Sequence, residues 1–483
     1  MARQGVTPRS EDYARWYTEV VQMAELADYA PVRGCMIIRP YGYELWEAVK
    51  AGLDRRFKET GHRNAYFPLF IPMSFIQKEA EHVEGFAPEL AVVTHGGGKE
   101  LEEPLVVRPT SETIIGHAFA SWVQSHRDLP LLINQWANVV RWEMRPRLFL
   151  RTTEFLWQEG HTAHATAEEA MEETLRILDI YADFAERDAA VPVIKGRKSA
   201  QEKFAGAADS YTIEAMMGNF WALQAGTSHF LAQNFARAFD ITYLDASNQL
   251  EHCWTTSWGV SSRMVGGIVM AHGDDGGLRL PPVVAPIQAV IVPIWRSDDD
   301  RGVVLEAAHR VTETLRADGV RVHLDEREGL TPGFKFNDWE MRGVPLRIEI
   351  GPRDVAAESV VLVRRDRDGK EAKSAASVTA IEDRVRDLLD AVQQSLLQQA
   401  AEFRDAHLHE ASSLDELRDI VSTGWALIPH CGTKECELSV KEETKATSRC
   451  FPLDRNPEWN PSGLSCGVCE RPALGYAYFA RAY

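Results

Sequence analysis

The chain has 483 residues, 45% hydrophobic and 26% charged, which is the composition of an ordinary globular protein with two to four domains. Its formal net charge of −18 excludes nucleic-acid binding through overall positive charge, so any RNA contact must use local basic patches. No apolar run reaches the roughly 18 residues of a membrane helix. Residues 1–19 are polar and do not resemble a secretory signal. We therefore expect a cytoplasmic protein with no membrane segment.

The first part of the chain predicts helices followed by a short strand. Apolar residues at helical spacing predict one helix within residues 1–30 and another that ends near Gly61. Residues 64–72, which contain two prolines, predict a short strand. In the stretch 108–113, RPTSET, either Thr110 or Ser111 is suited to cap a helix beginning near Glu112. Simple capping would by itself explain that stretch.

Residues 138–163, NVVRWEMRPRLFLRTTEFLWQEGHTA, predict two strands joined by a polar turn. The strands are expected over 138–143 and 148–158, with the turn at Pro146. Arg141 and Glu143 are two residues apart, so on a strand they share a face. A guanidinium binds phosphate or carboxylate and a carboxylate accepts from an amino group, so this pair suits a polyanion with an amine-bearing ring. Taken alone, Arg-x-Glu is more often an ion pair across a sheet.

The rest of the chain contains further local patterns. Residues 165–190 predict a surface helix, residues 224–229 (QAGTSH) a polar glycine turn, and residues 230–239 a helix. Glycines, Arg263 and an apolar helix follow. No Gly-x4-Gly-Lys-Ser/Thr loop occurs, which excludes a P-loop nucleotide site. After Pro281-Pro282, strands and helices alternate up to residue 350, which predicts an α/β sandwich with a mixed sheet.

Four of the seven cysteines lie near the end of the chain, as Cys431-x4-Cys436 and Cys466-x2-Cys469. In a chain expected to be cytosolic, such clustering indicates metal rather than disulfides. Four thiolates leave no open coordination position, so the predicted ion is a structural Zn²⁺. Reduced cysteines in a small core are the alternative.

Arg141-x-Glu143, the loop after it and Arg151 resemble motif 2 of the class II aminoacyl-tRNA synthetases. The wording RTTEFLWQEGH resembles the prolyl-tRNA synthetase family in particular. The helix and proline-containing strand before residue 72 resemble motif 1, and the glycines around Arg263 resemble motif 3. The likeness spans essentially the whole chain. It is to the archaeal and eukaryote-like type, because the stretch between Gly160 and Gly259 is too short for the editing insertion of the bacterial type.

The resemblance implies an α/β (α+β) fold in three parts. These are a class II antiparallel-sheet catalytic domain (1–282), an α/β anticodon-binding domain (283–385) and a small zinc-binding C-terminal domain (386–483). It implies ATP-dependent attachment of L-proline to tRNA(Pro) through a prolyl-adenylate, with Mg²⁺ accompanying ATP, in a homodimer. One rival is a paralogue that has lost chemistry and serves as a binding subunit, although such proteins usually lose the motif arginines. Another is an adenylating enzyme for a different acceptor, which would not need the middle domain.

The resemblance also assigns roles to individual residues. Arg141 and Arg263 would be catalytic, and Tyr483 would reach back towards the catalytic domain. Proline would be bound by Thr110, Glu112, Arg141, Trp157, Glu159, His161, Phe204, His229 and Ser261. ATP would be bound by Arg141, Glu143, Arg151, Thr152, Gln224, Thr227 and Arg263. Glu340 and Arg347 would read the anticodon, and the four cysteines named above would bind zinc.

Overall fold

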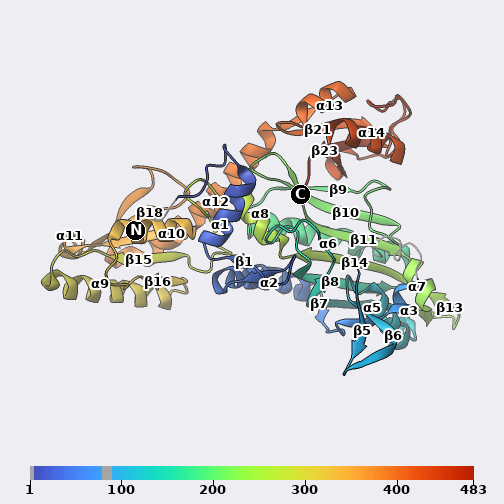
Figure 1. Cartoon of the computed structure of the whole chain (residues 1–483), viewed down its shortest axis with the longest axis horizontal. Coiled ribbons are helices and arrows are strands. Elements are labelled where there is room, and N and C mark those ends of the chain that lie inside the picture. Colours follow the sequence, from blue (N-terminus) through green and yellow to red (C-terminus); the bar gives the residue numbers. More distant parts are fainter. Residues whose placement is uncertain (1–4, 79–89) are drawn as a thin grey trace.

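The computed structural model describes residues 5–78 and 90–483 and is built on one eleven-stranded sheet (Figure 1). In spatial order its strands are β20 (Leu408–Glu410), β21 (Trp425–His430), β23 (Gly475–Ala480), β22 (Thr447–Pro452), β9 (Val193–Arg197), β10 (Asp209–Met216), β11 (Ala222–Ala232), β14 (Trp254–Ser261), β8 (Glu154–His164), β7 (Leu131–Val140) and β3 (Arg63–Asn64). Neighbouring strands are antiparallel except for the pairs β3–β7 and β20–β21. The predicted antiparallel catalytic sheet is therefore confirmed.

Four helices build the main hydrophobic core with this sheet: α1 (Tyr13–Met23), α2 (Pro40–Glu59), α6 (Ala167–Arg187) and α8 (Arg263–His272). Helix α6 begins with a capping box. The Thr166 hydroxyl accepts from the Glu169 backbone N–H, and the Glu169 carboxylate accepts from the Thr166 backbone N–H. Trp258 of β14 is buried against Tyr181 of α6. Since side chains alternate along a strand, the neighbours of Trp258 point to the sheet face that α6 does not cover.

The remaining elements of the first 280 residues lie around this sheet. A second core gathers α5 (Glu112–Trp122) and α7 (Asn234–Phe239). Three small groups of strands are β1 (Ala27–Tyr29) with β2 (Met36–Ile38), β4 (Phe70–Pro72) with β6 (Lys99–Val107) and β5 (Ala91–Gly96), and β12 (Thr242–Leu244) with β13 (Leu250–His252). Short helices occur at α3 (Met73–Ile76) and η2 (His126–Asp128).

The middle region forms a separate five-stranded mixed sheet, as predicted. Its order is β16 (Val322–Leu324), β15 (Ala289–Pro293), β17 (Leu346–Ile350), β18 (Ser359–Arg364) and β19 (Lys373–Ser377). Strand β15 is parallel to both of its neighbours, while β18 and β19 are antiparallel. The accompanying helices are α9 (Asp298–Ala317), α10 (Pro332–Met341), α11 (Pro352–Ala356), η3 (Val378–Ala380) and the start of α12 (Ile381–Ala406).

Helix α12 connects this sheet to the C-terminal region. Val385, Leu388 and Leu389 pack in the core of the middle region, whereas Val392 and Leu396 pack against Ala190. The C-terminal region adds α13 (Leu414–Ile420), α14 (Lys434–Thr444) and η4 (Leu453–Arg455), and its strands extend the large sheet. None of the helices in the described part of the chain has the length and apolarity that crossing a bilayer requires.

Five local predictions were wrong. The strand expected over residues 64–72 is not continuous, because β3 ends at Asn64 and β4 begins at Phe70. Strand β7 ends at Val140, so Arg141 and Glu143 lie beyond the strand rather than on one of its faces. The second strand of this pair begins at Glu154 and not at residue 148. Residues 224–229 belong to strand β11 rather than to a turn, and the helix expected over residues 230–239 covers only Asn234–Phe239.

Candidate active site

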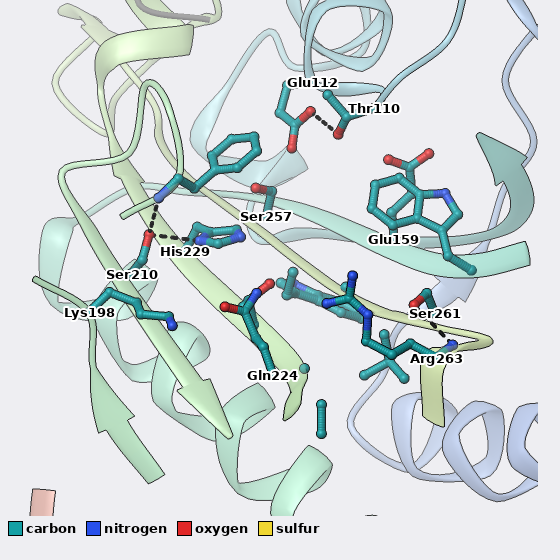
Figure 2. Close-up of a pocket in the computed structure, with 18 of the residues that line it drawn as sticks. Thr110, Glu112, Glu159, Lys198, Ser210, Gln224, His229, Ser257, Ser261 and Arg263 are labelled. Carbon is teal, nitrogen blue, oxygen red and sulfur yellow. Dashed lines mark hydrogen bonds between the residues drawn. The ribbon is translucent and has the colours of Figure 1, made fainter. Parts of the chain in front are cut away.

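A cavity of about 190 Å³ opens on the sheet face opposite α6. Strands β8 and β14 supply residues at every second position, because alternate side chains of a strand share a face. Trp157, Glu159 and His161 come from β8, and Ser257 and Ser261 from β14. The start of α5, the loop after β9, and strands β10 and β11 complete the walls (Figure 2).

One end of the cavity is acidic and buried. Thr110 Oγ1 donates to Glu112 Oε2 at 2.5 Å, and the other oxygen of Glu112 lies 3.6 Å from His161 Nε2. These three side chains are 1–5% exposed. Neither ring nitrogen of His161 has a hydrogen-bond partner among the described residues. A carboxylate and a hydroxyl held together away from water suit an ammonium group, which donates and carries positive charge.

Glu159 lies beside this acidic end and has partners of its own. Its carboxylate accepts from Ser111 Oγ at 2.5 Å and from Gln135 Nε2 at 2.8 Å. Burial raises the pKa of Glu159, and the nearby Glu112 adds to the shift. Ser111 occupies the N-cap position of α5, but its hydroxyl donates to Glu159 and makes no capping bond. The capping interpretation is therefore wrong for the side chain, which instead fixes a cavity carboxylate.

Aromatic groups form the apolar wall of the cavity. The rings of Phe204 and His229 are stacked, with their centroids 4.6 Å apart. The guanidinium carbon of Arg141 lies 5.3 Å from the centre of the Trp157 ring. His229 Nδ1 is 2.8 Å from Ser210 Oγ. Burial lowers the pKa of His229 to about 4, so its imidazole is neutral at pH 7. The wall therefore presents apolar faces without an additional positive charge.

Two arginines separate this cavity from a second one of about 260 Å³. Arg141 and Arg263 line both, and the second also contains Glu143, Arg151 and Thr152. Arg141 Nε donates to Pro109 O at 2.9 Å, and Arg263 Nε donates to Leu150 O at 2.9 Å, so backbone carbonyls orient both guanidinium groups. Burial lowers the pKa of Arg263 to about 10, with Arg141 and Arg151 as further causes, which still leaves it charged at pH 7.

The other nucleotide candidates divide between the two cavities. Glu143 forms an ion pair with Arg151 in the second cavity, and Thr152 Oγ1 donates to Glu154 O at 2.7 Å. Gln224 and Thr227 of β11 line the first cavity beside Ser261. The expectation that Tyr483 reaches back is confirmed: it lines the second cavity, and its N–H donates to Ala222 O at 3.1 Å.

The two anticodon candidates lie together in the middle region. Glu340 and Arg347 line one cavity of about 220 Å³. Arg347 Nε donates to Glu349 at 3.0 Å, and its guanidinium lies 4.2 Å from the centre of the Phe336 ring. A planar cation on an aromatic ring next to an acceptor is the type of surface that binds an unstacked base.

The four predicted cysteines converge in the C-terminal region. The Sγ atoms of Cys431 and Cys469 are 3.6 Å apart, and those of Cys436 and Cys466 are 3.8 Å apart. Tetrahedral bonds of about 2.3 Å to zinc would place sulfurs about 3.8 Å apart, so the thiols fit that ion. His430 also lies within 4.8 Å of three of them. The Nδ1 atom of His430 accepts a hydrogen bond from Gly432 N–H at 3.0 Å, so its neutral ring carries the proton on Nε2. This N–H is suited to donate a hydrogen bond to a thiolate.

The chain matches three family models in succession. One described as tRNA synthetase class II core domain (G, H, P, S and T) matches residues 93–272, one described as Anticodon binding domain matches residues 288–388, and one described as Prolyl-tRNA synthetase, C-terminal matches residues 414–483. A protein named Proline--tRNA ligase from Roseiflexus sp. strain RS-1 is 56% identical over the full length of both chains. This chain belongs to the prolyl-tRNA synthetase family.

Other proline--tRNA ligases are similar to this chain over nearly its whole length. Proline--tRNA ligase 2 of Rhodococcus jostii is 56% identical over the full length of both chains. The chloroplastic/mitochondrial Proline--tRNA ligase of Arabidopsis thaliana is 57% identical over 99% of this chain and 88% of its own length. The resemblance identified from the sequence, and the synthetase fold that it implied, are thus confirmed.

The structure adds cavity residues that sequence reasoning missed. These residues are Lys198, Ser210 and Ser257, which all line the cavity of about 190 Å³ in this prolyl-tRNA synthetase. Ser257 was detectable in principle, since Ser257, Gly259 and Ser261 recur at strand spacing. Lys198 follows β9 in an ordinary Gly-Arg-Lys sequence, and no local pattern distinguishes it from a solvated lysine.

Proposed function

We propose that this chain joins L-proline to tRNA(Pro) in two steps, through a prolyl-adenylate, with release of pyrophosphate and then AMP. The observation that carries the proposal is the buried Thr110–Glu112 pair, set between aromatic walls and next to Arg141. An acidic acceptor beside an apolar slot is complementary to a secondary ammonium in a hydrocarbon ring. A carboxylate held at the Arg141 side completes the features of proline.

In the first step the proline carboxylate attacks the α-phosphate of ATP. Thr110 and Glu112 hold the ammonium, and Trp157, His161, Phe204 and His229 enclose the ring, with Glu159 and Ser261 alongside. Arg141 bridges the carboxylate and the α-phosphate, so charge that develops between them meets a guanidinium oriented by Pro109 O. The protein contributes positioning and charge neutralisation rather than covalent chemistry.

The second cavity and β11 receive the nucleotide. Glu143 accepts from the adenine amino group, and Arg263 lies over the ring and near the terminal phosphates together with Arg151. Thr152, Gln224 and Thr227 complete the site. Mg²⁺ accompanies ATP and neutralises phosphate charge. Arg263 remains protonated in this role, because its lowered pKa of about 10 is still well above neutrality.

The other regions serve the tRNA and the fold. We divide the chain into a catalytic domain (1–282), an anticodon-binding domain (283–385) and a C-terminal domain (386–483). Glu340 and Arg347 read anticodon bases in the second of these. The thiolates of Cys431, Cys436, Cys466 and Cys469 hold a structural Zn²⁺ in the third, with Arg471 Nε donating to Cys469 Sγ at 3.2 Å. Four thiolates would leave no open position on this ion, so it would supply structural stability rather than chemistry.

We further propose a cytoplasmic homodimer. Tyr66, Phe70 and Trp122 are 72%, 45% and 49% exposed near the proline-containing segment that resembles motif 1. Exposed apolar groups gathered in one region are typical of an interface. A mass of two chains by light scattering would support the dimer, and the mass of one chain would contradict it.

The experiment that tests the proposed function is exchange of labelled pyrophosphate into ATP, with proline, alanine or histidine added. Proline should support strong exchange and histidine none. Alanine should support weak exchange, since lost methylenes cost only about 1–3 kcal/mol each. Without an editing domain, alanyl-tRNA should not be hydrolysed by the pure protein. Absence of proline-dependent exchange in a folded, zinc-loaded sample would instead favour a binding subunit.

A further inference from the structure

The C-terminal region and the catalytic sheet join through β22 and β9. Figure 1 shows β9 next to the C-terminal region that carries β21 and β23. Phe451 pairs with Arg197, and Pro452 pairs with Gly196. This approach requires glycine, since a Cβ at Gly196 would lie 2.5 Å from the Cβ and Sγ atoms of Cys450. The two regions therefore share one continuous sheet.

Three charged side chains are buried at this junction. Lys198 follows β9, Glu214 lies on β10 and Arg449 lies on β22, with exposures of 6%, 0% and 6%. Arg449 donates to Glu214 Oε2 from Nη2 at 2.9 Å and from Nε at 3.1 Å. Lys198 Nζ donates to Glu214 Oε1 at 2.9 Å and to Arg449 O at 2.9 Å. One carboxylate is thus shared between a cation from each region, and removing either cation leaves buried charge poorly compensated.

This triad reaches the substrate cavity through Lys198. Lys198 itself lines the cavity, and Figure 2 shows it on the same side as Gln224. Glu214 is the β-sheet partner of Gln224, at a register irregularity between Ile213 and Glu214. Thr212, which faces Thr227 across the same strand pair, donates to Glu214 Oε1 at 3.0 Å. The position of Glu214 therefore determines how β10 pairs with β11, the strand that carries Gln224 and Thr227.

We propose that Arg449 is a positioning residue for the adenylation step. Acting through Glu214, it fixes Lys198 and the β10–β11 pair, so that the C-terminal region sets the nucleotide side of the cavity. The inference rests on the proposed function, which assigns Gln224 and Thr227 to ATP. It goes beyond that function because it makes the C-terminal region part of the geometry on which ATP binding depends.

The test is pyrophosphate exchange by R449M, with rates expressed per active site after titration of the adenylate formed in a single turnover. The KM for ATP should rise about ten-fold or more, since small displacements of positioning groups are costly. The KM for proline should stay within about two-fold of wild type. R449K keeps the charge but loses the forked contact, and should give an intermediate KM for ATP. R455M is the matched control, because Arg455 pairs with Glu410 on the surface of the same region.

The outcomes separate the possible explanations. If Arg449 only stabilises the fold, R449M will have fewer active sites but a wild-type KM for ATP at each of them, and the inference is overturned. If R449M does not fold, R449K decides: a raised KM for ATP supports the inference and a wild-type value overturns it. If wild-type protein shows no exchange, the proposed function fails first, which is a distinct result.

Discussion

Among single residues, Glu112 is the one to which the proposed function gives the most specific part in substrate selection. Its carboxylate is 5% exposed, accepts from Thr110 and faces His161. A buried carboxylate in this position selects a cationic amino group over a neutral one, because an unpaired charge in such a site is unfavourable. The apolar wall then discriminates by shape alone, which is a weaker form of selection.

Substitution of Glu112 by Gln should lower kcat/KM for proline by about 10–100-fold, since hydrogen bonds to charged groups contribute about 1.5–3 kcal/mol. The KM for ATP should change little. The measurement is pyrophosphate exchange with varied proline. E172Q is the control, as Glu172 is 72% exposed on α6. Equal effects on the proline and ATP constants would contradict the assignment of Glu112 to the ammonium.

Buried histidines should make stability depend on pH. Burial lowers the pKa values of His164, His229 and His272 to about 4, below the usual 6.5. Between pH 6.5 and 4 the unfolded chain therefore binds more protons than the folded chain. The contribution of the three neutral histidines to the free energy of unfolding is complete above pH 6.5 and is lost as the pH falls towards 4. In H272Q, the thermal midpoint should fall less steeply between pH 6.5 and 4 than in wild type. Equal slopes would contradict the neutral buried state of His272.

At the scale of elements, strands β8 and β14 form the floor of the site, and their contact depends on one glycine. Gly160 faces Trp258 in the strand register, and a Cβ at Gly160 would lie 2.1 Å from the indole. That indole also packs against Phe57 and Tyr181, so it has no space into which to move.

Substitution of Gly160 by Ala should therefore lower stability by about 1–3 kcal/mol and reduce exchange activity, because the core becomes overpacked. Gly302 is a matched control in helix α9, where an added Cβ meets nothing within 4 Å. G302A should be neutral or stabilising by up to ~1 kcal/mol. Urea unfolding provides the comparison, and a G160A protein as stable as G302A would show that β8 and β14 are not so tightly apposed.

Sequence patterns predicted the long helices and the middle sheet, because their apolar periodicity coincides with burial. They failed where burial has another cause. Leu148, Phe149 and Leu150 are 1–3% exposed in a turn, with Phe149 at a φ of 61°, so their apolar character indicated burial but not a strand. Thr153 N–H donates to the distant Gly34 O at 2.7 Å, a contact that no local pattern reveals.

The candidate site shows the same division. The motif residues were predicted because they stand in long, specific sequence matches. Strand β11 was mistaken for a turn because its polar residues, including Gln224 and Thr227, line a cavity rather than solvent. Lys198 and Arg449 were missed because their shared partner, Glu214, brings together segments far apart in the sequence.

For the whole molecule, the C-terminal region that carries the proposed zinc site is an integral part of the large sheet. Wild-type protein should contain about one zinc per chain by elemental mass spectrometry. C466A should lose the metal and unfold at lower temperature, since structural zinc contributes folding free energy directly. C450A should keep the zinc, because Cys450 is buried at the β22–β9 junction outside the cluster. Full zinc content in C466A would contradict the four-cysteine site.

The most direct measurement of the complete reaction is charging of a tRNA(Pro) transcript with labelled proline and ATP. We predict prolyl-tRNA formation with one AMP released per molecule charged, and no charging when alanine-specific tRNA replaces tRNA(Pro). Failure of folded, zinc-loaded protein to charge tRNA(Pro), at proline and ATP concentrations that saturate the exchange reaction, would contradict the assignment of this chain as a proline-attaching enzyme.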